Sequence, residues 1–401
     1  MGIIINAGLI LADGETLVRS SAVRIKRNSI VEIDSFDRLR RGNPGDEIYD
    51  FPGAAILPGF TNAHCHLELD WCEGRISYNG NFLDWLQSIR DIKFGANPPI
   101  PNPFPSIAKM FMTGTTTLVD HYVMPMPTAK IHKTGLRYYP LKEMFEFNNH
   151  SPNPSEIARR TAFSFAVHSP YTTSKEIALT CRRLADRWGR PLSTHISEMK
   201  DEIEFIRSGN EHVEKLLRKS DTYDEGWRGL GKTPIEYFYK LGLLNTRTYG
   251  VHINYWEDND LYYLSASRLT PVFCPKSHRY FKHPRHPIED YLRVGLKVAL
   301  GTDSLASNDA LSMLQEARLV IEDHPGIQMK DILDSITVNG LRPLGLHTRL
   351  GKIAPGRIAD LTVWDSINGD TPDEVIHEVI MHRESTLLTM ANGVVRHLTS
   401  V

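Results

Sequence analysis

Eight short apolar stretches rich in β-branched residues recur between residues 55 and 301 of this 401-residue chain, and longer amphipathic stretches separate them. The eight predicted strands cover residues 55–66, 115–121, 136–141, 164–168, 192–196, 248–253, 271–274 and 297–301. Predicted helices between them cover residues 81–92, 175–187, 200–208 and 234–241. Strands that alternate with helices indicate a parallel sheet, and eight such units close a (β/α)8 barrel. The pattern therefore predicts an α/β fold built on a TIM barrel.

The two ends of the chain carry a different pattern. Short β-like runs separated by Gly, Asp and Asn cover residues 3–6, 22–25 and 30–33, and β character returns at residues 361–364, 378–381 and 387–394. We expect residues 1–55 and 346–401 to be two halves of one β-sandwich domain. The barrel, residues 56–345, would then be inserted between them. We find no short repeat and no low-complexity linker in the sequence.

Composition argues against several classes of protein. The formal net charge is −2 and no basic stripe with interleaved aromatic residues occurs, so nucleic-acid binding is disfavoured. No stretch of 18 apolar residues predicts a membrane span, and the N-terminus lacks the basic segment of a signal peptide. The four cysteines form no C-x-x-C pair, which is typical of a reducing compartment. We therefore expect a cytoplasmic protein that binds a small molecule, and a homo-oligomer is compatible with these features.

Histidine and aspartate side chains lie at the ends of several predicted strands. His64 and His66 end the first strand, and an i, i+2 pair on a strand projects from one face, so both imidazoles can bind one cation. His195 ends another strand, and Asp303 follows the last. Any one of them alone is more often an ordinary polar residue than a ligand. Because catalytic groups gather at the C-terminal face of a barrel, we interpret the four together as ligands of one divalent ion.

Three imidazoles and one carboxylate suit Zn²⁺, Fe²⁺ or Mn²⁺, and zinc is the ion we expect. Such an ion with an open position lowers the pKa of a bound water toward about 7. Glu198, three residues after His195, could pass a proton from that water to a substrate; the alternative is a favourable charge at a helix N-terminus. His252 could orient the hydroxide, or be a further ligand or a packing residue.

These residues, with several short motifs, resemble the amidohydrolase superfamily and in particular its mononuclear deaminase branch. The motifs are Pro58-Gly59-Phe60, Gly114-Thr115-Thr116-Thr117, His168-Ser169-Pro170-Tyr171, His195-x-x-Glu198 and Gly301-Thr302-Asp303. The resemblance implies a distorted barrel with a flanking β-sandwich and metal ligands at His64, His66, His195 and Asp303. It also implies that Glu198 is the proton shuttle, that His252 hydrogen-bonds the hydroxide and that Asp303 shares the water's proton. The predicted fourth strand ends in His168, not in a lysine suited to a carbamate bridge, which favours one ion over two.

Within that branch, residues 274–277 and 300–309 are most similar to aminodeoxyfutalosine deaminases of menaquinone biosynthesis, and residues 66–69 fit that group. The resemblance implies hydrolytic deamination of an adenine-type nucleoside, and 6-amino-6-deoxyfutalosine is the substrate that it favours. Deaminases of adenosine, S-adenosylhomocysteine, methylthioadenosine or guanine stay open, as do chlorohydrolases, cyclic amidases and a non-catalytic scaffold with the same fold. His278 stands where that group would carry Asn, which leaves the nucleoside specificity open.

Substrate contacts are expected from a further set of residues. His168 and Ser307 resemble positions that contact the base or the sugar in adenosine-type relatives. Glu68 is a candidate for a ribose diol, because a carboxylate accepts two hydroxyl donors; the alternative is a solvent-facing loop charge. Arg279 is a candidate for the pocket mouth. Residues 226–233 match G-x-x-x-x-G-K-T, but the polar segment before them is not the strand that a phosphate-binding loop requires.

Overall fold

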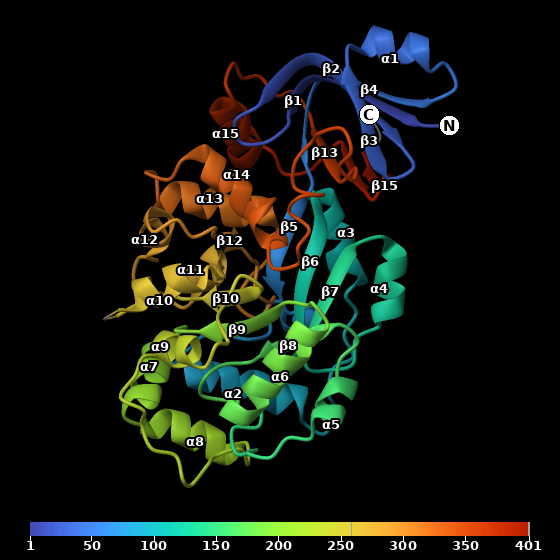
Figure 1. The fold of residues 1–401 in the computed structure, drawn as a ribbon. Helices are drawn as coiled ribbons and strands as arrows, with labels where there is room; N and C mark the ends of the chain where they lie inside the picture. The colour runs from blue at the N-terminus through green and yellow to red at the C-terminus, as the bar shows by residue number, and fades with distance from the viewer. Residues whose placement is uncertain (258, 400–401) are drawn as a thin grey trace.

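The computed structural model describes residues 1–257 and 259–399, which two β-sheets organise (Figure 1). The larger sheet is parallel, with the strand order β12-β11-β10-β9-β8-β7-β6-β5. Its strands are β5 (Phe60–Cys65), β6 (Thr115–Tyr122), β7 (Arg137–Met144), β8 (Ser164–Val167), β9 (Leu192–Ile196), β10 (Thr248–His252), β11 (Thr270–Phe273) and β12 (Ala299–Leu300). The predicted eight-stranded α/β barrel is confirmed.

The residues that follow β12, the last strand of the sheet, contact β5, the first strand. The amide groups of Thr302 and Asp303 both donate to the His64 carbonyl, at 3.0 and 3.2 Å, and Asp303 forms a parallel bridge with Cys65. This contact requires a glycine at position 301, because a Cβ there would lie 2.7 Å from the Cβ of His64. The sheet is therefore nearly closed at the point where the predicted metal ligands lie.

Helices follow the barrel strands and cover the sheet from outside. They are α2 (Phe82–Lys93), α3 (Phe104–Met112), α4 (Thr128–Thr134), α5 (Pro154–Arg159), α6 (Lys175–Arg187), α7 (Lys200–Arg207), α8 (Glu211–Lys219), α9 (Pro234–Lys240), α10 (Asp260–Ser267), α11 (Pro275–Tyr280), α12 (Ile288–Arg293), α13 (Met313–Asp323) and α14 (Met329–Ile336). α6 illustrates why they form: Ser174 caps its first turn by accepting from the Ile177 amide, and Ile177, Cys181 and Ala185 repeat every four residues on its buried face. No helix of the described residues is long and apolar enough to cross a membrane.

Both ends of the chain share the smaller sheet, which lies at one end of the barrel (Figure 1). Its order is β15-β14-β13-β4-β1-β2-β3, with bounds β1 (Ile3–Leu11), β2 (Leu17–Lys26), β3 (Ser29–Asp34), β4 (Glu47–Pro58), β13 (Leu361–Trp364), β14 (Leu388–Ala391) and β15 (Val394–Leu398). Ile5 and Val23 from the N-terminal part share one apolar cluster with Leu361 and Met390 from the C-terminal part. α1 (Phe36–Gly42) and α15 (Pro372–His382) complete this region. The exact domain limits at residues 55 and 346 stay a prediction.

Two sequence predictions need correction. Residues 55–66 were expected as one strand, but Gly59 separates β4 of the smaller sheet from β5 of the barrel. A Cβ on Gly59 would lie 2.6 Å from the Thr116 side chain, so the crossing depends on this glycine. Residues 378–381 were expected as a strand but belong to α15. A capping box between Thr371 and Glu374 starts that helix, and its apolar residues are buried on one helical face.

Candidate active site

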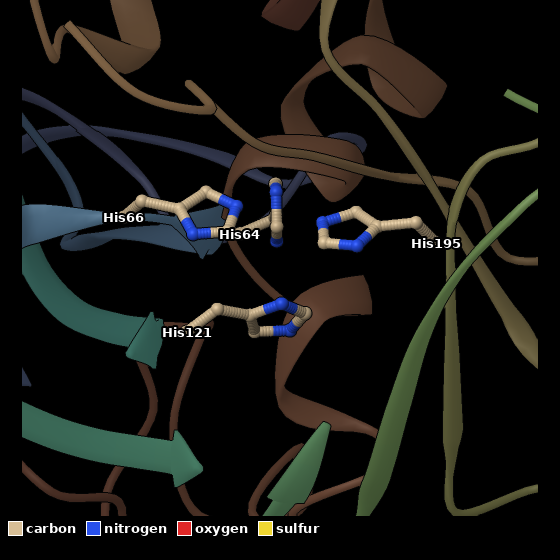
Figure 2. Close-up of side chains that lie close together, drawn as sticks. All are labelled: His64, His66, His121 and His195. Atoms are coloured by element: carbon tan, nitrogen blue, oxygen red, sulfur yellow. The ribbon is translucent and has the colours of Figure 1, made fainter. Parts of the chain in front are cut away.

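Four side chains that the sequence singled out lie together at the C-terminal ends of the barrel strands. His64 lies in β5, His66 follows that strand, His195 lies in β9 and Asp303 follows β12. The ring centres of His66 and His195 lie 4.8 and 5.0 Å from that of His64, and Figure 2 shows these rings arranged around one centre. The Asp303 Oδ1 atom lies 3.6 Å from His64 Nε2 and 3.7 Å from His66 Nε2. Asp303 therefore lies beside His64 and His66, and these two histidines lie together with His195.

Hydrogen bonds among these side chains do not satisfy their polar atoms, whereas the spacing of the atoms suits a divalent cation. Both His64 ring nitrogens are buried without a hydrogen-bond partner among the described residues, a costly state unless another group satisfies them. The two distances to Asp303 exceed hydrogen-bond length and approach the separation of about 3.4 Å expected between neighbouring ligands of a tetrahedral ion. His195 Nδ1 donates to the His168 carbonyl at 3.0 Å, which leaves Nε2 as its ligand atom.

The protonation states also suit cation binding. Burial lowers the pKa values of His64 and His66 and lowers that of His195 to about 4, so all three imidazoles are neutral near pH 7. Burial alone would raise the pKa of Asp303, but the contact with His64 and the neighbouring imidazoles bring it well below its usual range. Neutral imidazoles and an ionised carboxylate are the forms that bind a metal ion.

Two serine hydroxyls fix the orientation of the Asp303 carboxylate. Ser277 Oγ and Ser307 Oγ donate to its Oδ2 atom at 2.7 and 2.8 Å. Oδ1 is then the atom that faces the histidines. Ser307 therefore acts on the site through Asp303 in this structure.

Glu198 and His252 form a second pair beside the ligands. Glu198 Oε1 lies 3.2 Å from His252 Nε2, and both side chains are buried or nearly so. Burial raises the pKa of Glu198 well above its usual range, and the nearby carboxylates Asp303 and Glu202 raise it further. The side chain of Glu202 accepts the amides of Ser197 and Glu198, both at 2.9 Å, and so holds the loop that carries Glu198. Glu198 can therefore hold a proton near neutral pH.

The backbone is strained where these residues leave their strands. Ser197, His252 and Asp303 have φ values of 51°, 70° and 54°, although none of them is glycine. Each such residue costs on the order of 1–3 kcal/mol, and strain of this kind clusters at functional sites because it aims side chains. Here it turns the chain ends of β9, β10 and β12 toward one centre.

The sequence analysis missed two site residues, His121 of β6 and Glu143 of β7. His121 was not among the predicted ligands, but its ring centre lies 4.4 Å from that of His64, and one of its ring nitrogens lies within 4.8 Å of a ring nitrogen of each of His64, His66 and His195 (Figure 2). Glu143 was not singled out; its Oε1 atom lies 3.3 Å from His121 Nδ1 and 3.8 Å from His195 Nδ1. Both residues lie in the C-terminal halves of their strands, which is the signal that could have found them.

A cavity opens above this cluster, and only one of the three expected substrate contacts lines it. His168 lines the cavity, beside the ring of Phe145 at 4.3 Å. The fully buried Glu68 carboxylate instead pairs with Lys93 and accepts the Val123 amide, so its oxygens are engaged within the protein.

The remaining expectations concern residues outside the cavity. Ser307 binds Asp303 and is not among the residues that line the cavity. Arg279 pairs with Glu322 and Asp323 on the surface and is not among the residues that line the cavity. Neither Ser307 nor Glu68 therefore lines the cavity in which a substrate would contact it.

Known proteins resemble this chain over most of its length. The profile of the Amidohydrolase family matches residues 55–395. The 5-methylthioadenosine/S-adenosylhomocysteine deaminase of Pyrococcus furiosus is 30% identical over 393 residues, which cover 90% of this chain and 85% of that protein.

The chain belongs to the amidohydrolase family.

Solved structures align with nearly the whole length of this amidohydrolase. The aminofutalosine deaminase of Helicobacter pylori in complex with methylthio-coformycin aligns with a TM-score of 0.84 at 22% identity and covers 98% of this chain and 99% of its own. An adenosine deaminase from Xanthomonas campestris with bound zinc aligns with a TM-score of 0.81, also at 22% identity, over 100% and 94% of the two chains. At this identity the alignments establish the shared fold.

Proposed function

We propose that this amidohydrolase hydrolyses the exocyclic amino group of an adenine-type nucleoside, with one zinc ion as cofactor and 6-amino-6-deoxyfutalosine as its substrate. The observation that carries the proposal is the buried Glu198, paired with His252 at 3.2 Å beside the cluster of His64, His66, His195 and Asp303. The deaminases among its relatives support an adenine nucleoside as the substrate class. The four cysteines are all unpaired, which supports a place in the cytoplasm.

His64, His66, His195 and Asp303 would hold the ion, which would supply a water activated for attack on the ring carbon. Glu198 holds a proton and can deliver it to the ring nitrogen beside that carbon, so negative charge does not build up on the ring. His252 lies within hydrogen-bond reach of Glu198 and can orient the attacking water. The ionised Asp303, fixed by its two serine donors, can take up the proton that the water loses.

His168 gives the purine a polar anchor on the cavity wall. Its Nδ1 atom lies 2.7 Å from the Thr172 hydroxyl, so Nε2 stays open for a substrate. Burial lowers the pKa of His168 well below its usual range, so the ring is neutral and can match a neutral purine. Phe145 and Tyr171, which also line the cavity, add flat apolar surface.

Ammonia release by purified protein of known metal content tests this proposal. We expect the ultraviolet shift of adenine deamination with 6-amino-6-deoxyfutalosine, and weaker activity with adenosine, methylthioadenosine or S-adenosylhomocysteine. Protein treated with a chelator serves as the matched control and should release no ammonia. Turnover of a chlorinated or cyclic-amide substrate, without ammonia from any aminopurine nucleoside, would contradict the proposal.

A further inference from the structure

The outer part of the active-site cavity has a character of its own. α2 forms one wall and α8 packs against it, and Figure 1 shows the two helices together at the end of the molecule remote from the smaller sheet. Apolar residues from these elements line the cavity there: Leu86, Ile89, Phe94, Leu216 and Leu217. These apolar side chains lie on the α2 and α8 side of the cavity that also holds His66, His195 and Glu198, so they fit an apolar extension of the substrate.

Two cations on α2 lie three residues apart and both line this cavity. Lys93 is neutralised, because its Nζ atom pairs with the fully buried carboxylate of Glu68. Arg90 is not: no carboxylate oxygen lies within 4.0 Å of its guanidinium, and its side chain makes no hydrogen bond, among the residues that the structure describes. Its Cζ atom lies 5.6 Å from the centre of the Phe94 ring, which places the charge beside the apolar wall.

The one acidic neighbour of Arg90 in sequence is already engaged. Asp91 accepts from Gln87 and pairs with Lys219 of α8 at 3.2 Å, on the exposed side of the contact between the two helices. Burial lowers the pKa of Arg90, and the charge of the neighbouring Asp91 offsets this cost only in part, because the two side chains form no ion pair among the described residues. A half-buried guanidinium in a ligand cavity, with no ion-pair partner in the part of the chain that the structure describes, points to an anion that arrives with the ligand.

We propose that Arg90 binds a carboxylate at the far end of an apolar 5′ substituent of the nucleoside. This inference rests on the proposed function, because the purine amino group must lie at Glu198 for the argument to hold. The amino carbon and the ribose attachment lie at opposite ends of a purine, so the 5′ carbon points outward along the cavity. The apolar wall of α2 and α8 then contacts the substituent, and Arg90 meets its terminus.

A single carboxylate fits this position better than a phosphate. One guanidinium matches the charge and the planar, two-oxygen shape of a carboxylate, whereas a dianion would need a second free cation. Lys93 cannot serve as that cation while Glu68 holds it. The hydroxyls of Ser220 and Thr222 line the same cavity and can add neutral donors.

A matched pair of substrates isolates the carboxylate: 5′-S-(4-carboxybenzyl)-5′-thioadenosine and 5′-S-benzyl-5′-thioadenosine. We expect the wild-type kcat/KM to be at least tenfold higher for the acid, equivalent to about 1.4 kcal/mol. Arg90→Met should bring the ratio of the two kcat/KM values to about one, mainly through the KM of the acid, because the contact is remote from the reacting carbon. Arg90→Lys should retain part of the preference.

Lys219→Met is the matched control, since it removes a cation from the same helix contact but does not line the cavity. It should leave the ratio within twofold of wild type. Equal wild-type kcat/KM values for the two nucleosides, or an unchanged ratio in Arg90→Met, would overturn the role of Arg90 and leave the proposed deamination intact. Ammonia from neither nucleoside would refute the proposed function and this inference together. If Arg90→Met does not fold, the wild-type ratio alone decides.

Discussion

Replacing Glu198 with glutamine separates proton transfer from metal binding. The substitution keeps the length of the side chain and an oxygen that can accept from His252 Nε2, now 3.2 Å from Glu198 Oε1, but removes the acidic proton. A positioned general acid–base contributes about 10²–10⁴-fold to rate. We therefore expect kcat to fall at least about 100-fold, or about 2.7 kcal/mol in the activation barrier. The bound metal should stay, because Glu198 is not one of the four proposed ligands.

The assay combines the ultraviolet change on deamination with metal analysis of the same sample. Glu204→Gln is the matched control, because this exposed carboxylate lies on α7, just beyond the Glu198 loop, and does not line the cavity. Its kcat should stay within about twofold of wild type, as expected for a surface change. A metal-loaded Glu198→Gln protein with near-normal kcat would refute the shuttle role.

Three further predictions follow from the same structure. Removal of the metal with a chelator should abolish turnover, and added zinc should restore it. Full activity in protein shown to be metal-free would contradict this prediction. Burial raises the pKa of Glu202 from 4.5 to about 7, so its stabilising contribution is complete below about pH 4.5 and is lost as the pH rises to 7. Glu202→Gln should therefore flatten the pH dependence of the unfolding free energy by up to about 1.4 kcal/mol per pH unit. Urea denaturation at pH 5, 6 and 7 measures this, and the same pH dependence in wild type and variant would contradict it. The buried Asp360 accepts two hydrogen bonds from the half-buried Arg137, at 2.9 and 3.0 Å, and one from the Asn392 amide. Asp360→Asn should therefore lower the unfolding free energy by about 2–3 kcal/mol in urea denaturation, with metal content unchanged, and an unaltered midpoint would rule this out.

The barrel and the positions of His64, His66, His195 and Asp303 were predictable because strand periodicity and strand ends are local properties of a sequence. Glu143 was not, because the predicted strand stopped at residue 141 whereas β7 continues to Met144. An error of three residues at a strand end was enough to hide a carboxylate that contacts two histidines of the site. Element ends depend on tertiary contacts that local pattern does not contain.

Side chains that depend on distant partners were predicted least well. Glu68 was expected to face a ribose or solvent, but the 3₁₀ segment Leu67–Cys72 turns it toward Lys93 of α2. Arg90 was not singled out, since a charged residue in an amphipathic helix normally faces solvent. Only the packing of α2 against α8 makes it part of a cavity wall.

Anomalous diffraction at the zinc edge from crystals of the zinc-loaded protein tests the central claim most directly. We predict one peak, about 2.0–2.2 Å from a nitrogen of each of His64, His66 and His195 and from a carboxylate oxygen of Asp303. A crystal with full zinc content but no peak among these four side chains, or with its peak between His121 and Glu143 instead, would contradict the account.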